Sequence, residues 1–189
     1  MSYVKPLVFE NAKPTSILQD IAITIAASLG IGFLAQLAIP LPFTPVPIAT
    51  QNSFVLLLGA LLGARRGAAA VFAFLAQGAM GFPVFAGGVG GAAKILGPTG
   101  GYLIGYLVAA FVVGALMEKW KERTVSKTFL SLAAGHLTIY LFGAAYLSTF
   151  LGFEKALLLG VAPFVIGDLL KIVLSLKILN WVDRIRNRA

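Results

Sequence analysis

An aspartate and a lysine lie three residues apart inside an apolar stretch near the end of the chain. Asp168 and Lys171 are the charged residues of segment 156–176. A charge near the bilayer centre costs about 2.5–3.5 kcal/mol on insertion scales. Side chains three residues apart share a helix face, so pairing offsets part of that cost. The pair therefore predicts either a structural ion pair between packed helices or a polar ligand site in the membrane, the usual role of intramembrane charges.

The composition of the whole chain indicates a membrane protein. Hydrophobic residues make up 59% and charged residues 12%, and mean hydropathy is +0.92, whereas soluble domains average about 45–50% and about 25%. The charge-free gaps 21–64, 67–93, 95–117 and 128–153 can each hold a span of about 20 residues. We expect one all-α integral membrane domain over residues 1–189.

The apolar runs predict a bundle of six transmembrane helices. We place these helices at about 17–39, 51–64, 68–80, 100–117, 129–151 and 157–181. Segment 40–51 has four prolines and no charge, so it should be stiff and extended, as either a flap over a ligand on the outer face or a simple connector. The Gly-rich segment 81–102 is too apolar for an exposed loop, and we expect it to be partly buried with backbone groups free to face a polar ligand.

The basic residues predict an orientation. Twelve of the 15 Lys and Arg residues fall on one side of the expected bundle, two fall on the other side, and Lys171 lies within a span. The positive-inside rule then places both termini in the cytoplasm of a multi-pass cell-membrane protein. This rule also explains the net charge of +8. Because no basic stripe alternates with aromatic residues, we expect no nucleic-acid partner.

The sequence lacks the residues that several kinds of chemistry require. The chain has no cysteine and one histidine, so we expect no metal site and no cofactor. No Gly-x-x-x-x-Gly-Lys-[Ser/Thr] pattern occurs, which argues against ATP binding. No grouping typical of a nucleophile is visible, so we assign no catalytic residues. His136, with Tyr140 one turn later, is expected to form an interhelical hydrogen bond or to contact a ligand.

Small residues recur every four positions on the first expected helix, at Ala22, Ala26 and Gly30. Such a ridge lets another backbone approach closely. The pattern is typical of packing within the bundle, and it could equally dock a partner membrane protein.

Four motifs follow one another along the chain: Pro42-Phe-Thr-Pro-Val-Pro-Ile48 with Gln51, Gly81-Phe-Pro-Val-Phe-Ala-Gly-Gly88, Gly97-Pro-Thr-Gly-Gly-Tyr102 and Gly167-Asp-x-x-Lys171. Together they resemble the BioY family, the biotin-specific S components of energy-coupling-factor (ECF) transporters. The resemblance implies six helices, capture of biotin from outside, and a transmembrane T component with paired ABC-type ATPases as partners. It also implies docking of the T component on the first-helix ridge and a flap role for the Pro-rich loop. Val89 and Leu103 stand where some relatives are expected to carry polar residues.

The residues that we expect at the substrate are Asp168, Lys171, Gln51, Phe85, Gly88, Gly91, Tyr102 and His136. Lys171 could neutralise the biotin carboxylate or donate to the ureido oxygen, while Asp168 could accept from a ureido N–H. The sequence allows both pairings. A stand-alone biotin facilitator is the main alternative function. An intramembrane enzyme that uses Asp168 as acid or base, or a passive channel, fits the sequence less well.

Overall fold

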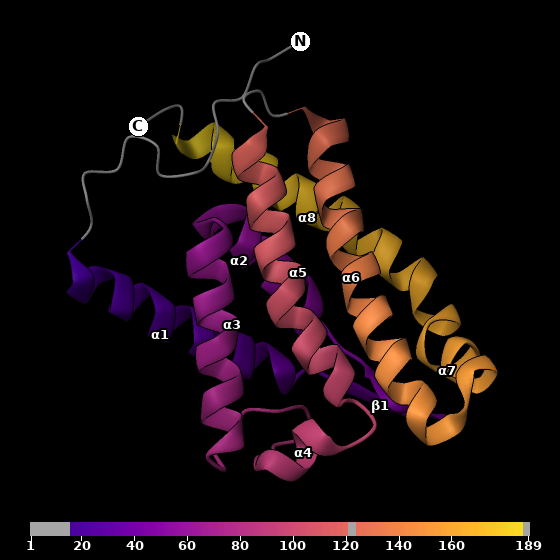
Figure 1. Ribbon diagram of the computed structural model, residues 1–189. Coiled ribbons are helices and arrows are strands. Elements are labelled where there is room, and N and C mark those ends of the chain that lie inside the picture. The colour runs from indigo at the N-terminus through magenta and orange to yellow at the C-terminus, as the bar shows by residue number, and fades with distance from the viewer. Residues whose placement is uncertain (1–15, 121–123, 187–189) are drawn as a thin grey trace.

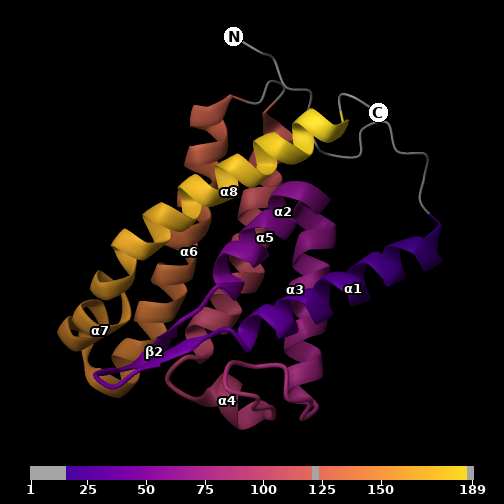
Figure 2. The same ribbon diagram turned by 180° about the vertical axis from the view of Figure 1, so that it is seen from behind.

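The computed structural model describes residues 16–120 and 124–186, and these form a helical bundle with one small hairpin (Figure 1; Figure 2). The elements are α1 (Ile17–Ala35), β1 (Ile39–Leu41), β2 (Thr44–Ile48), α2 (Gln51–Leu62), α3 (Ala64–Ala79), α4 (Ala92–Leu96), α5 (Gly100–Lys119), α6 (Val125–Leu151), α7 (Phe153–Gly160), the 3₁₀ turn η1 (Ala162–Phe164) and α8 (Val165–Arg186).

The helical membrane class that the sequence predicts agrees with the structure. Four helical stretches of the described chain are long and apolar enough to cross a bilayer: Ile17–Ala35, Gly100–Lys119, Val125–Leu151 and Phe153–Ile185. Helices α2 and α3 have 12 and 16 residues, about 18 and 24 Å at 1.5 Å per residue. They are shorter than a hydrocarbon core of about 30 Å, so the count of six spans stays a prediction.

The last expected helix, 157–181, is interrupted in the structure. Helix α7 ends at Gly160, η1 follows, and α8 begins at Val165. Pro163 lies in this break. Because proline has no amide N–H and its ring clashes with the preceding helical turn, it favours a break here. The break lets α7 and α8 run in different directions (Figure 2).

The Pro-rich segment is extended, as expected, but it also forms the antiparallel hairpin β1–β2, which an all-α prediction did not include. Ile39 pairs with Ile48, and Leu41 pairs with Thr44. The hydroxyl of Thr44 donates a 2.7 Å hydrogen bond to the carbonyl oxygen of Leu159 in α7. The hairpin is therefore bound to α7, an element that is distant in the sequence and lies on the α6–α8 side of the bundle.

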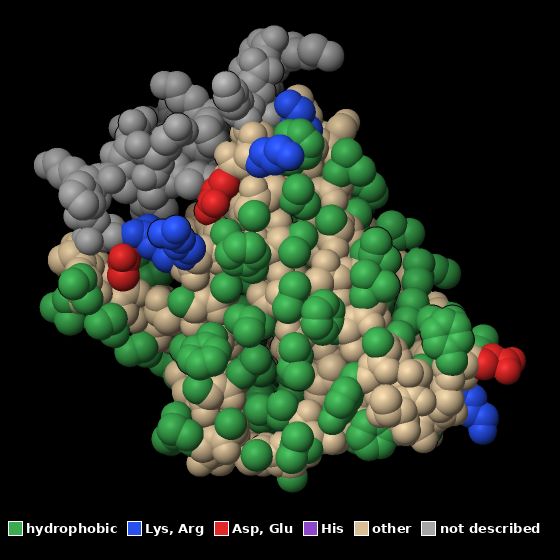
Figure 3. All heavy atoms as spheres, viewed as in Figure 1, with side chains coloured by type: hydrophobic (Ala, Val, Ile, Leu, Met, Phe, Trp, Pro, Cys, Tyr) green, Lys and Arg blue, Asp and Glu red, His purple; other side chains and the backbone are tan. Residues whose placement is uncertain are grey.

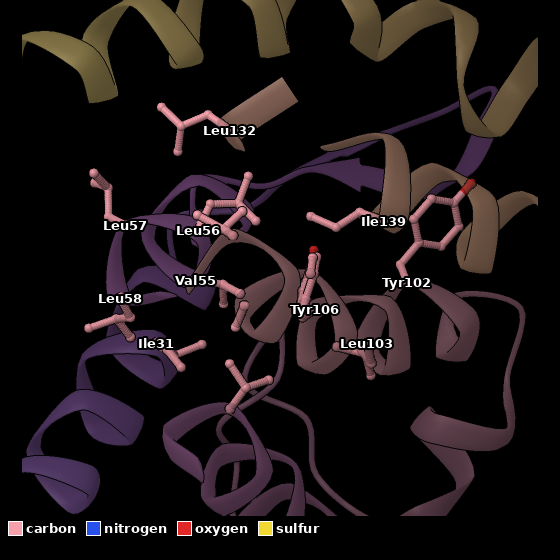
Figure 4. Close-up of a cluster of buried hydrophobic side chains, with 14 of the residues drawn as sticks. Ile31, Val55, Leu56, Leu57, Leu58, Tyr102, Leu103, Tyr106, Leu132 and Ile139 are labelled. Atoms are coloured by element: carbon pink, nitrogen blue, oxygen red, sulfur yellow. The ribbon is translucent and has the colours of Figure 1, made fainter. Parts of the chain in front are cut away.

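Helix α5 lies at the centre, between α2 and α3 on one side and α6 on the other (Figure 1). Leu56 from α2, Tyr106 from α5 and Ile139 from α6 belong to one buried cluster (Figure 4). Glycines allow this closeness: a Cβ at Gly59 would overlap the carbonyl of Ala110 in α5. Large apolar side chains also cover the outside, as lipid contact requires (Figure 3).

Several of the described basic residues gather at one end of the bundle (Figure 3). Arg65 and Arg66 begin α3, Lys119 ends α5 and Lys127 begins α6. The opposite end has Lys94 on α4 and Lys155 on α7, together with the hairpin. Some basic residues of the sequence count lie outside the described residues: Lys5, Lys13, Lys121, Arg123 and Arg188.

Candidate ligand-binding site

A buried carboxylate joins three helices. Asp168 is 4% exposed, and its Oδ1 accepts hydrogen bonds from Asn52 Nδ2 at 3.2 Å and Lys171 Nζ at 2.9 Å. Its Oδ2 accepts from the hydroxyl of Tyr140 at 2.5 Å. The predicted pairing of Asp168 with Lys171 is confirmed. The carboxylate thus connects α8 to the start of α2 and to the middle of α6.

The ammonium of the pair is also fully engaged with protein groups. Lys171 Nζ donates to the carbonyl oxygen of Ala49 at 2.8 Å and to Asn52 Oδ1 at 3.3 Å, besides its bond to Asp168. These three acceptors match the three N–H donors of an ammonium. Lys171 consequently holds the chain that leads from β2 into α2.

His136 lies beside this cluster without a hydrogen bond to it. Its Nδ1 is 3.1 Å from the carbonyl oxygen of Leu132, four residues earlier in α6. Its Nε2 has no hydrogen-bond partner among the described residues and is 3.9 Å from Asp168 Oδ2. The expected interhelical hydrogen bond of His136 is therefore wrong, because the ring bonds within its own helix. Tyr140, one turn later, makes that bond.

A small pocket opens next to the charged cluster, at the end of the bundle that has the hairpin. Its cavity volume is about 40 Å³, and about 400 Å³ of space surrounds it when the open solvent at its mouth is included. Strand β2, the start of α2, the Gly-rich segment, α4 and the start of α5 supply its walls. The lining residues are Val46, Pro47, Ala49, Gln51, Phe85, Ala86, Lys94, Thr99, Tyr102, Leu103 and Tyr106.

Three of the residues expected at the substrate line this pocket: Gln51, Phe85 and Tyr102. The ring of Phe85 packs edge-on against Phe74 at 5.4 Å. The hydroxyl of Tyr102 donates to the carbonyl oxygen of Gly160 at 2.8 Å. Both aromatic walls are therefore fixed by contacts behind them.

The other five expected substrate residues are not among the lining residues: Asp168, Lys171, His136, Gly88 and Gly91. Gly88 and Gly91 have positive φ, the conformation that glycine adopts most readily. Their amides donate to the carbonyls of Phe85 and Gly78, so they shape the turn behind the Phe85 wall.

Sequence reasoning missed Asn52, Lys94, Thr99 and Tyr106 as site residues. Two signals were available. Gln51 and Asn52 are consecutive amide side chains at the start of an apolar helix, and Lys94 is the one charge between Arg66 and Glu118. Of the two positions where some relatives are expected to carry polar residues, Leu103 lines the pocket and Val89 is half-exposed outside it.

The first-helix ridge divides into two parts. Ala22 and Ala26 are exposed on the outside of α1. Gly30 faces inward, and a Cβ there would lie 3.0 Å from the ring of Phe54 in α2. Gly30 thus serves packing within the bundle, and the outward part of the ridge consists of the two alanines.

A small, mostly apolar pocket with a few polar groups at one end of a helical membrane bundle has the features of a binding site for a small molecule. The chain belongs to the BioY family, whose model matches residues 8–188. Its relatives include the probable biotin transporter BioY of Pyrococcus horikoshii, 44% identical over 127 residues (67% of this chain, 74% of the relative). The biotin transporter BioY of Rhizobium etli is 39% identical over 163 residues (82% and 86%).

A solved structure has a similar fold. It is a crystal structure of the S-component for biotin from an ECF-type ABC transporter, 32% identical, with a TM-score of 0.76. The similarity covers 91% of this chain and 93% of the other. Since the relatives are named as transporters and the fold is that of a transporter subunit, the alternative of an intramembrane enzyme is set aside.

Proposed function

We propose that this protein is the biotin-binding S component of an ECF-type vitamin importer. The observation that carries the proposal is the pocket, which lies at the end of the bundle that has fewer basic residues. The fold around it is similar over nearly its whole length to that of a biotin S component. Biotin has an apolar bicycle and valeryl chain between two polar ends. Apolar walls with a few placed polar groups are what such a ligand requires.

The position of the pocket supports capture from outside the cell. The basic end of the bundle lies opposite the pocket (Figure 3). It is formed by the ends of α3, α5 and α6 that have Arg65, Arg66, Lys119 and Lys127. The positive-inside rule assigns that basic end to the cytoplasm. In this orientation both termini are cytoplasmic, the protein lies in the cytoplasmic membrane, and the β1–β2 hairpin covers the ligand from outside.

Energy for import would come from partner proteins. The chain has no phosphate-binding loop pattern, and an ECF assembly supplies a T component and a pair of ABC-type ATPases. We propose that the T component docks on the outer face of α1 at Ala22 and Ala26, because small side chains let another helix approach closely. A facilitator that works without these partners is the second candidate function.

The role of the Asp168–Lys171 pair is part of the proposal. Direct contact with biotin would require each group to give up protein partners that now satisfy it. Lys171 instead holds the carbonyl of Ala49, and Asp168 holds Asn52, which is adjacent to Gln51. We therefore propose that the pair positions the pocket wall formed by Ala49 and Gln51.

Isothermal titration of the purified protein with biotin, dethiobiotin and thiamine tests the substrate. We expect tight binding of biotin, weaker binding of dethiobiotin and none of thiamine. Ala86→Trp, which fills the pocket, should abolish binding, whereas Ala93→Trp on the exposed side of α4 should not. Absence of biotin binding by the wild-type protein, or equal binding by both tryptophan variants, would contradict the proposal.

A further inference from the structure

Positive charge gathers at the end of the bundle that lies opposite the pocket. Arg65 and Arg66 are in the first turn of α3, Lys119 is in the last turn of α5, and Lys127 is in the first turn of α6. These four residues form the basic rim. Figure 3 shows blue Lys and Arg side chains along this end, above a face covered by green apolar side chains. The rim therefore borders the surface that faces lipid.

The carboxylates described at this end compensate only part of the charge of the basic rim. Asp20 pairs with Arg66 at 2.8 Å, and Glu118 accepts a 2.8 Å hydrogen bond from the first amide of α3. No described carboxylate forms an ion pair with Arg65 or Lys119, and both of these side chains are exposed. Two cations of the rim are thus open to an anion from outside the chain.

The positions of these cations do not stabilise the helices that carry them. Arg65, Arg66 and Lys127 stand at helix starts, where the macrodipole disfavours positive charge. Asp20 on α1 and Glu118 on α5 supply negative charge near the start of α3. With two cations still open, the rim as a whole favours a further anion.

The surroundings of the basic rim are those of a membrane interface. Phe72 follows Arg65 by seven residues, so it lies on the same face of α3, and it is 64% exposed. Leu130, three residues after Lys127, is 58% exposed. Trp120 ends α5, and the ammonium of Lys127 lies 5.3 Å from the centre of its ring. Tryptophan is enriched at the level of lipid headgroups, so the rim combines cations, an interfacial indole and exposed apolar side chains.

We propose that the basic rim binds the headgroup of an anionic phospholipid, with the acyl chains of that lipid along the exposed apolar faces of α3 and α6. The cations recognise the phosphate, and the apolar side chains recognise the acyl chains. A zwitterionic lipid has the same chains, but the positive charge of its choline compensates its phosphate, so the rim prefers the anionic lipid. This interaction is independent of the ligand in the pocket.

Quenching of Trp120 fluorescence by brominated lipids tests the proposal. The chain has two tryptophans, so Trp181→Phe leaves Trp120 as the only reporter. This reference protein is placed in phosphatidylcholine nanodiscs that contain increasing fractions of phosphatidylglycerol or phosphatidylcholine brominated near the top of the acyl chains. We expect the anionic lipid to quench at a mole fraction about 25-fold lower, about fivefold for each of the two open cations. Equal quenching by the two lipids would overturn the proposal.

Variants of the exposed cations show whether the basic rim causes this preference. In the reference protein, Arg65→Gln/Lys119→Gln should abolish the preference and leave biotin binding unchanged, whereas Arg65→Lys/Lys119→Arg should retain the preference. Lys155→Gln is the matched control, because Lys155 is exposed on α7 at the other end of the bundle, and it should also retain the preference. A preference that survives the loss of both rim cations would overturn the assignment.

A soluble phosphate ester distinguishes a lipid site from a phosphate site. Glycerol phosphate at millimolar concentration has the charge of the headgroup without acyl chains, so it should leave quenching by the anionic lipid unchanged. If it lowers this quenching to the level of the zwitterionic lipid, the basic rim binds soluble phosphate esters, and the lipid assignment is wrong.

Discussion

Removal of the Asp168 carboxylate should destabilise the protein strongly, and removal of both members of the pair should not. In Asp168→Ala, the ammonium of Lys171 loses its counter-ion while its side chain stays about 20% exposed. The hydroxyl of Tyr140 and the amide of Asn52 lose their acceptor in the same step. The variant therefore leaves one charge and two polar groups without their partner.

The magnitude follows from these lost interactions. Two interhelical hydrogen bonds in a membrane protein contribute about 0.6–1.7 kcal/mol each. Leaving one charge of a buried pair uncompensated raises the total to about 3–5 kcal/mol. We expect the free energy of unfolding of Asp168→Ala to fall by that amount, a factor of roughly 100 or more in the folding equilibrium.

The double variant Asp168→Leu/Lys171→Met separates a structural pair from a ligand contact. Replacing both charges by apolar groups of similar size is often neutral, so we expect at least half of the lost stability to return. Biotin affinity should return with it, because neither side chain lines the pocket. The assays are denaturant titration in detergent for unfolding and isothermal titration for biotin.

Two results would refute this reasoning. A double variant as unstable as Asp168→Ala would show that uncompensated charge is not the cause of the loss. A double variant that folds stably but no longer binds biotin would make the pair a direct ligand contact, as one interpretation of the sequence predicts.

Three further predictions address the hairpin, the docking face and the packing. Thr44→Val removes the hydrogen bond from the hairpin to Leu159, so stopped-flow measurements should show faster biotin release with little change in association; unchanged release would argue against a lid. Ala26→Trp should abolish uptake in cells that contain the ATPase partners and leave binding by the purified protein intact; persistent uptake would contradict docking at this face. Gly59→Ala should cost about 1–3 kcal/mol of stability, because a Cβ there overlaps α5, whereas Gly167→Ala, with nothing within 4 Å, should cost far less.

The sequence by itself determined the features that depend on local pattern. Long charge-free runs indicate that the chain is a membrane protein, because burial of such runs is favourable in lipid. The spacing of Asp168 and Lys171 on one helix predicted their ion pair, which the structure contains. Prolines between residues 40 and 51 predicted an extended segment, because their φ angles are restricted. The order of the four motifs was sufficient to identify the family.

Only the tertiary structure decided which polar groups face the pocket. Asp168 meets Asn52, 116 residues away, and Lys171 meets Ala49, 122 residues away. No local pattern encodes such contacts, because they depend on where α2 and α8 come together. Those contacts saturate the charged pair, while Gln51 is left with an open acceptor and Lys94 lines the pocket. The hydrogen-bonding capacity that remains after the helices have packed determines which residues are available to a ligand.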